Sequence, residues 1–285
     1  MISRRVREKI AFTCLRLSAL LVLAVLVAIL YYIVTNGIGV VNIGFLLKNP
    51  EEGMTRGGIF PAIVGTVYLV ALTLLFALPL GVSTAIYLSE YARGKNDRVV
   101  MIIKMATRIL AGIPSIVYGL LGLGLFVLFL NLHFSILSAS LTLSFLTVPI
   151  IIAASEEALE SVPMSYREAA LALGATRWQT IRSAVLPYAL PGIMTGSILG
   201  LSRAAGETAP IMITGVAYYL PRLPTSLFDQ FMALPFHIFT LSTQSSNPQL
   251  TRPLQFGTVF VLMALVLVMN LAAIVIRSRY SRLRA

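Results

Sequence analysis

Apolar runs long enough to cross a lipid bilayer recur along the whole chain and limit its possible folds more than any other feature. A helix needs about 20 mostly apolar residues to span a bilayer. We predict six spanning helices, at about Leu15–Thr35, Phe60–Leu88, Ile109–Leu130, Phe134–Ala154, Tyr188–Thr214 and Gln255–Ile276. The sequence therefore predicts an all-α integral membrane protein with six transmembrane helices.

The composition supports the bilayer as the surrounding medium. Hydrophobic residues make up 58% of the 285 residues and charged residues only 12%, whereas soluble domains carry about 25% charged residues. A formal net charge of +11 would suggest nucleic acid binding in a soluble protein. Here the basic residues cluster beside the apolar runs, as they do in cytoplasmic loops of membrane proteins. We therefore expect a lipid bilayer, and no nucleic acid, as a partner.

The positions of the basic residues predict the orientation of the helices. Basic clusters precede the first span, separate the second from the third and the fourth from the fifth, and close the chain. Because such clusters stay inside, both termini are expected in the cytoplasm, with the chain in a bacterial or archaeal plasma membrane. Two long loops, Asn36–Gly58 and Ala217–Leu254, then face outward. The apolar piece Leu227–Phe239 in the second loop has about half the length of a span, so we predict an interfacial or re-entrant element.

Residues able to carry chemistry are sparse. The single cysteine, Cys14, excludes an intrachain disulfide, and His133 and His237 lack metal-ligand spacing. The sequence has no G-x-x-x-x-G-K-[ST] phosphate loop and no catalytic constellation. We therefore expect no enzyme activity and no bound cofactor in this chain.

A patterned polar loop, Ser155–Pro187, joins the fourth and fifth spans on the cytoplasmic side. Two pairs have the spacing of capping boxes: Ser165 with Glu168, and Thr176 with Gln179. Gly174 suits the C-terminal turn of the first helix, and Leu186-Pro187 should end the second. The pattern predicts a helix–turn–helix with Trp178 at its turn, which suits docking of another surface better than an ordinary solvated loop does.

The same loop carries a family signature. Its residues Glu168-Ala169-Ala170, Gly174, Ile181 and Leu186-Pro187 resemble the EAA loop of type I ABC importer permeases. Three further strings are similar to those of the permeases of phosphate importers: Gly57–Pro61, Gly112–Ser115 and Arg203–Pro210. The resemblance covers nearly the whole chain.

The resemblance implies a type I permease fold with a cytoplasmic coupling helix, and a transport subunit without its own ATP site. Expected partners are a second homologous permease that completes a heterodimer, a cytoplasmic ATPase dimer that binds ATP and Mg²⁺, and an extracytoplasmic phosphate-binding protein. The EAA residues would couple this chain to the ATPase. The implied domains are residues 1–60 (N-terminal cytoplasmic segment, first helix and outer loop), 61–276 (transmembrane domain, with the EAA loop at about 156–187) and 277–285 (basic cytoplasmic tail).

Two charged residues lie inside the fifth predicted span. Arg203 and Glu207 are four residues apart, so we expect them on one helix face, beyond the bilayer midplane. A central arginine costs about 2.5–3.5 kcal/mol to insert and should therefore face a partner or a watery path. One interpretation is a buried pair that only locks helices together. The other is a substrate path, in which Arg203 attracts an oxyanion, Glu207 orients Arg203, and Thr208 donates a weaker hydrogen bond.

Three other interpretations stay open. The chain could be a same-family permease for another oxyanion, such as sulfate or molybdate. It could be an ion-coupled secondary transporter, which should carry inverted repeats and broken midplane helices and no ATPase dock. It could also be a membrane scaffold that signals phosphate status, a role compatible with transport.

Overall fold

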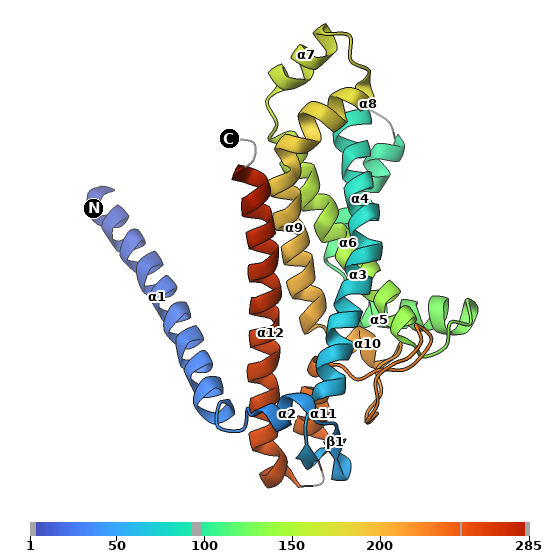
Figure 1. The fold of residues 1–285 in the computed structure, drawn as a ribbon. Helices are drawn as coiled ribbons and strands as arrows, with labels where there is room; N and C mark the ends of the chain where they lie inside the picture. The colour runs from blue at the N-terminus through green and yellow to red at the C-terminus, as the bar shows by residue number, and fades with distance from the viewer. Residues whose placement is uncertain (1–3, 93–97, 246, 283–285) are drawn as a thin grey trace.

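The computed structural model describes residues 4–92, 98–245 and 247–282. Part of the basic cluster between the second and third predicted spans, and the last three residues of the basic tail, lie outside these ranges. Most of the long helices run along one common direction (Figure 1). The elements are, in chain order, α1 (Arg4–Gly37), α2 (Ile43–Leu47), β1 (Pro50–Glu51), η1 (Glu52–Met54), β2 (Arg56–Gly57), α3 (Phe60–Ile86), η2 (Tyr87–Tyr91), α4 (Arg98–Ala111), α5 (Ser115–Gly122), η3 (Leu123–Phe129), α6 (Ile136–Glu160), α7 (Met164–Ala172), α8 (Arg177–Thr180), η4 (Ile181–Val185), α9 (Leu186–Gly206), α10 (Ala209–Met212), α11 (Leu234–Thr243) and α12 (Pro248–Arg282).

Five helices of the described chain are long and apolar enough to cross a membrane. They are Glu8–Gly37, Phe60–Tyr91, Ile136–Glu160, Arg177–Gly206 and Pro248–Arg279. A bent pair, α4 with α5 and η3, makes a sixth crossing if it counts as one span. The prediction of an all-α membrane protein with six spanning segments is confirmed, with one segment bent.

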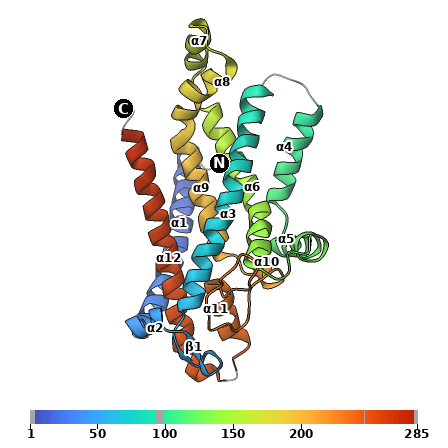
Figure 2. The ribbon, with the colours of Figure 1, turned by 45° about the vertical axis from the view of Figure 1, so that its right-hand side comes forward.

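The third span is not one straight helix over the predicted Ile109–Leu130, and the kink that Pro114 predicts is confirmed. α4 ends at Ala111, α5 begins at Ser115, and the two parts are bent by 108°. Pro114 causes the break, because it caps α5 with an extended ψ of 138° and its ring disfavours a helical conformation at Ile113. α5 and η3 therefore leave the bundle sideways (Figures 1 and 2).

The prediction that the second helix of the cytoplasmic loop ends at Leu186-Pro187 is wrong. α8, η4 and α9 form one continuous helix from Arg177 to Gly206. The π-helical turn η4 precedes Pro187, and its wider turn relieves the clash that a proline ring makes with the carbonyl of the preceding turn. The loop is therefore joined directly to a spanning helix.

The fifth span also ends earlier than the predicted Thr214. α9 stops at Gly206, and Glu207 has an extended backbone with φ −73° and ψ 133°. Pro210 explains where the break falls, because a proline inside a continuous helix would collide with the carbonyl four residues earlier. The short helix α10 follows and packs against α5 and α6.

α3 and α6 form the centre of the bundle. They pack along their lengths, and Ser144 on α6 donates a hydrogen bond from Oγ to the carbonyl of Thr73 on α3 at 3.0 Å. Leu69 and Leu143, one from each helix, lie in the same buried apolar cluster as Phe231. α9 packs on both helices, so the three together form the packed centre of the bundle.

A segment that we call the cover, residues 217–243, closes the end of the bundle opposite α7 (Figure 1). The backbone N–H of Leu234 donates to Oγ1 of Thr66 on α3 at 2.9 Å. Gly65 permits this approach, because a Cβ there would lie 2.0 Å from the carbonyl oxygen of Met232. The apolar piece predicted at Leu227–Phe239 does not span, as expected, and it packs on α3.

The first helix stands apart from the bundle over most of its length (Figure 1). No residue of its most apolar described window is buried, and its main packing is with α12. There the rings of Tyr32 and Phe256 meet edge to face, with centroids 5.3 Å apart. The first turn of α1, the end of α12 and α7 lie in the same half of the molecule (Figure 1), as an even number of crossings requires.

Candidate coupling site and substrate path

The docking element predicted from the cytoplasmic loop consists of α7 and α8, which project from one end of the bundle (Figure 1). α7 begins at Met164, its N-cap is Pro163, and no side chain of the described residues caps it. The predicted capping box of Ser165 and Glu168 is therefore wrong. The helix starts one residue ahead of Ser165, which places that side chain inside the first turn.

The second predicted capping box is confirmed. Oγ1 of Thr176 accepts a hydrogen bond from the N–H of Gln179 at 3.3 Å, and Oε1 of Gln179 accepts one from the N–H of Thr176 at 2.7 Å. Gly174 ends α7 with a left-handed φ of +80°. Its N–H donates to the carbonyl of Leu171, and that of Ala175 donates to the carbonyl of Ala170, which is the Schellman arrangement.

The family-signature residues divide into an exposed set and a packed set. Glu168, Ala169 and Gly174 are exposed on the docking element. The packed set comprises Ala170, Leu186 and Pro187, which are half-buried, and Ile181, which is buried. Five large apolar side chains are exposed on the same element, with Leu173 at 90% exposure: Met164, Tyr166, Leu171, Leu173 and Trp178. Sequence reasoning missed the two leucines, although apolar residues on a short helix between polar ones were a usable signal.

Arg167 ties α7 to the end of α3. Its Nη2 lies 2.6 Å from Oε1 of Glu90, and the two side chains are 5% and 7% exposed. Its Nε donates to both carboxylate oxygens at 3.2 and 3.1 Å. The remaining donors reach the carbonyls of Val162 at 2.7 Å and Leu159 at 2.9 Å. Sequence reasoning missed this pair because its members are 77 residues apart.

The three residues predicted for the substrate path gather where α9 ends. Arg203 is in the last turn of α9, and its Nε lies 3.4 Å from Oε1 of Glu207. Glu207 lies beyond the helix, so the expectation that both share one helix face is wrong, although the ion pair forms. Thr208 precedes α10, which no described side chain caps. The side chain of Arg203 is 43% exposed and that of Glu207 16%, so part of the arginine side chain is accessible from outside this chain.

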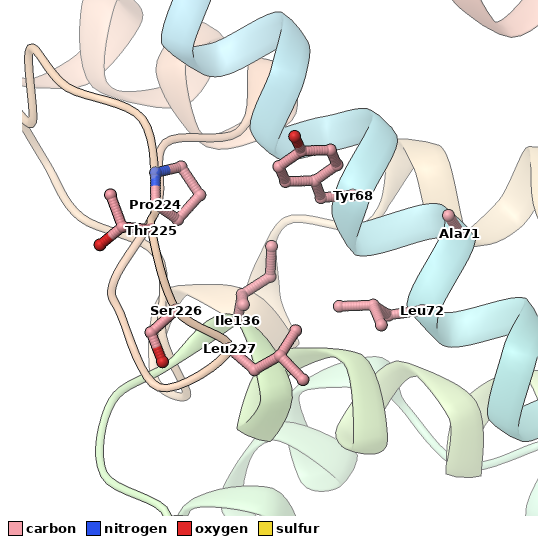
Figure 3. A pocket seen from close by; sticks show the side chains of 8 residues that line it. All are labelled: Tyr68, Ala71, Leu72, Ile136, Pro224, Thr225, Ser226 and Leu227. Carbon is pink, nitrogen blue, oxygen red and sulfur yellow. The ribbon is translucent and has the colours of Figure 1, made fainter.

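A cavity of about 400 Å³ lies beneath the cover (Figure 3). Its lining comes from α3, the start of α6 and the cover loop, through Tyr68, Ala71, Leu72, Ile136, Pro224, Thr225, Ser226 and Leu227. The carboxylate of Asp229 holds the loop, since it accepts hydrogen bonds from the N–H and hydroxyl of Thr225 and from the N–H of Ser226. The hydrogen bonds from Thr225 and then Ser226 lower the pKa of Asp229 below its usual value.

A second, polar cavity of about 350 Å³ lies between α4 and α6, in the half of the molecule that carries α7. Its lining combines both signs of charge: Lys104, Thr107, Arg108, Ala153, Glu156, Glu157 and Glu160. Lys104 forms an ion pair with Glu156. No short-range sequence pattern connects these residues.

Comparison with known proteins identifies the protein family of this chain. Residues 77–283 match the family model described as "Binding-protein-dependent transport system inner membrane component". The chain belongs to this family. It is therefore a type I ABC importer permease and a multi-pass inner-membrane protein of bacterial type, which replaces the alternative of an ion-coupled secondary transporter.

Curated relatives of the permease match it over nearly its full length. "Phosphate transport system permease protein PstA 1" of Mycobacterium tuberculosis (strain CDC 1551 / Oshkosh) is 34% identical over 288 residues, covering 99% of this chain and 92% of the relative. "Probable ABC transporter permease protein YqgI" of Bacillus subtilis (strain 168) is 32% identical over 283 residues, 95% of each chain.

Solved structures share the fold of the permease. A chain of the structure titled "Crystal structure of a bacterial ABC transporter involved in the import of the acidic polysaccharide alginate" has a TM-score of 0.66 at 17% identity, covering 96% of both chains. An inward-facing MetNI methionine ABC transporter has a TM-score of 0.60 at 20% identity, covering 78% of this chain and 94% of the other. At these identities the likeness concerns the fold alone.

Proposed function

We propose that the permease forms half of a phosphate path in an ATP-driven importer. Similarity over nearly the full chain to a phosphate transport permease supports phosphate as the cargo. The observation that carries the proposal is Arg203, whose side chain is 43% exposed in the last turn of α9, beside a helix break.

An exposed arginine among spanning helices needs water or another protein beside it. In lipid, a central arginine costs about 2.5–3.5 kcal/mol on insertion scales, and an aqueous path shared with a second subunit removes this cost. The planar guanidinium can donate two parallel hydrogen bonds to phosphate oxygens. Glu207, 3.4 Å from Arg203, competes for the same donors and so favours release of the anion.

We infer one partner at each of three places: the exposed Arg203, the docking element and the cover. A second homologous permease completes the path on the Arg203 side as a heterodimer. A cytoplasmic ATPase dimer, which binds ATP and Mg²⁺, docks on α7 and α8, where exposed Leu173 and Trp178 offer apolar contact beside Glu168. An extracytoplasmic phosphate-binding protein delivers the anion at the cover.

Uptake of radiolabelled phosphate by the assembled complex tests the role of Arg203. Arg203→Gln keeps polarity and approximate bulk but removes the charge. Loss of charge-assisted hydrogen bonds worth about 1.5–3 kcal/mol should lower uptake about tenfold or more, while the complex stays assembled in the membrane. Arg279→Gln, at an exposed position on α12, is the matched control and should transport normally.

The double variant Arg203→Gln with Glu207→Gln separates a substrate path from a structural pair. The double variant removes both charges, so no unpaired charge remains. If the pair is purely structural, assembly and uptake should therefore both be normal. We expect assembly without uptake, and wild-type uptake would remove Arg203 from the path. Competition by sulfate or molybdate as strong as by phosphate would instead favour a permease for another oxyanion.

A further inference from the structure

α3 connects the docking element to the cavity beneath the cover. Its inner extension, the π-helical turn η2, contains Glu90 and Tyr91. Near its other end, Thr66 accepts the hydrogen bond from the cover, and Tyr68 and Leu72 line the cavity (Figure 3). A displacement of α3 along its axis or in tilt would therefore change the cavity.

Both helices of the docking element, α7 and α8, contact the end of α3. Arg167 of α7 grips the carboxylate of Glu90, and the guanidinium carbon of Arg177 of α8 lies 5.4 Å from the ring centroid of Tyr91. All residues of α7 are described, and Arg167 alone among them is buried. Its side chain points away from the docking surface and into the bundle.

We propose that the Glu90–Arg167 ion pair is the tether through which movement of α7 reaches α3 and the cavity. The inference rests on the proposed function in one respect, namely that an ATPase moves α7. Along the chain, α7 is joined only to α6 and, through α8, to α9. α3 is not joined to α7 along the chain, so movement reaches it through side-chain contacts, and the Glu90–Arg167 pair is the contact that joins α3 to α7 directly.

The chemistry of the pair suits a tether better than an apolar contact would. Two apolar surfaces can slide past each other. The guanidinium of Arg167, by contrast, donates to both carboxylate oxygens of Glu90, and such a pair has a defined planar geometry. Its hydrogen bonds to the carbonyls of Leu159 and Val162 also fix the end of α6. Separation would leave two buried charges unpaired, which strongly opposes opening of the pair during the cycle.

Thiol labelling of the assembled complex, purified with its ATPase, tests the tether. The sequence contains one cysteine, so Cys14→Ser leaves this chain without other thiols, and labelling is quantified on this chain after its separation from the other subunits. Ser226→Cys reports on the cavity, and Leu173→Cys reports on docking of α7. With the tether intact, a non-hydrolysable ATP analogue should change the labelling rate of Ser226→Cys.

In Glu90→Gln and in Arg167→Gln we expect this nucleotide response at Ser226→Cys to fall about fivefold or more, while Leu173→Cys stays protected. Arg279→Gln, the control, should keep both responses. Glu90→Gln with Arg167→Gln removes both charges, so no unpaired charge disturbs the fold, and the assembled complex should still fail to respond.

A wild-type response at Ser226→Cys in that double variant would overturn the proposal, because the pair would then only stabilise the fold. An unchanged response in both single variants would overturn it as well. The labelling measures thiol reactivity and not transport of phosphate. Failure of phosphate uptake would therefore count against the proposed function, while the labelling would still test the tether.

Discussion

At the scale of single residues, the contact between α3 and the cover depends on Gly65. The Met232 carbonyl occupies the space that a side chain at this position would need. The neighbouring Thr66 hydroxyl accepts the N–H of Leu234, so the spacing of the two segments is set by a hydrogen bond as well as by the missing side chain.

Gly65→Ala should therefore loosen the cover. A Cβ placed 2.0 Å from the Met232 oxygen must displace backbone, and overpacking of this kind costs about 1–3 kcal/mol. We expect a lower midpoint of thermal unfolding for the purified protein. Gly124→Ala is the control, since no described atom would lie within 4 Å of its Cβ. Equal midpoints for the two variants would contradict this account.

His237 makes the stability of the cover depend on pH. It is buried in α11, its Nδ1 has no hydrogen-bond partner among the described residues, and burial lowers its pKa to about 4. An unfolded histidine has a pKa of about 6.5. Stability should therefore be full above pH ~6.5 and fall as the pH drops toward about 4, by at most about 1.4 kcal/mol per pH unit.

His237→Phe should flatten this dependence in thermal unfolding measured across that pH window. The aromatic ring keeps the apolar contacts and removes the titrating group. His133→Asn, an exposed position with a left-handed φ of 58° that asparagine tolerates, should keep the wild-type dependence. An unaltered slope in His237→Phe would assign the pH sensitivity to another group.

At the scale of elements, the docking element owes its shape to local caps of unequal strength. The capping box of Thr176 and Gln179 fixes the start of α8, and Gly174 turns the chain between the two short helices. α7 begins only with a proline, which supplies a suitable φ of −57° but no side-chain hydrogen bond from the described residues.

Thr176→Ala should loosen this element more than Ser165→Ala does. Loss of an N-cap costs about 1 kcal/mol, which corresponds to about fivefold faster amide exchange if α8 opens locally. Hydrogen exchange of the segment 164–180 measures this effect. Ser165 takes no part in a described cap, so Ser165→Ala should exchange as the wild type does. Equal acceleration by both variants would argue against the capping geometry.

Local determinants explain which elements could be predicted from the sequence. The capping box at Thr176 and the turn at Gly174 depend on residues within a few positions, and both were predicted. Hydropathy stays high across Pro114 and Pro210, so apolar runs alone do not reveal the breaks there; the proline at 114 predicts a kink, whereas the end of α9 before Pro210 was not predicted. The Glu90–Arg167 pair depends on the packing of distant helices, which no local pattern encodes. The roles of Glu168 and Arg203 stay predictions.

At the scale of the whole molecule, the fold separates two ends with different surfaces. One half carries α7, α8, the N-terminal end of α1 and the C-terminal end of α12. The other half carries α2, the short strands and the cover (Figures 1 and 2). Basic residues gather at the first of these ends. Because basic clusters stay in the cytoplasm, we predict that the α7 end is the inner end.

Reporter fusions test this orientation. A reporter joined after residue 285 should be active only if it is of a kind that works in the cytoplasm. A reporter inserted at Asn247, beside the cover, should be active only if it is of a kind that works outside the membrane. Alkaline phosphatase and a fluorescent protein that folds in the cytoplasm provide the two readouts. Phosphatase activity at the C-terminus would reverse the orientation.

The placement of α1 has a consequence for biogenesis. Its main packing partner is α12, where Gly37 and Tyr32 meet Phe256, and α12 leaves the ribosome after all the other described helices. During synthesis α1 therefore has lipid, the translocon or another subunit beside it, while the helices between them assemble. The contact between α1 and α12 can form only after the helices between them have been synthesised, so truncation before α12 should leave the first helix without its main packing partner.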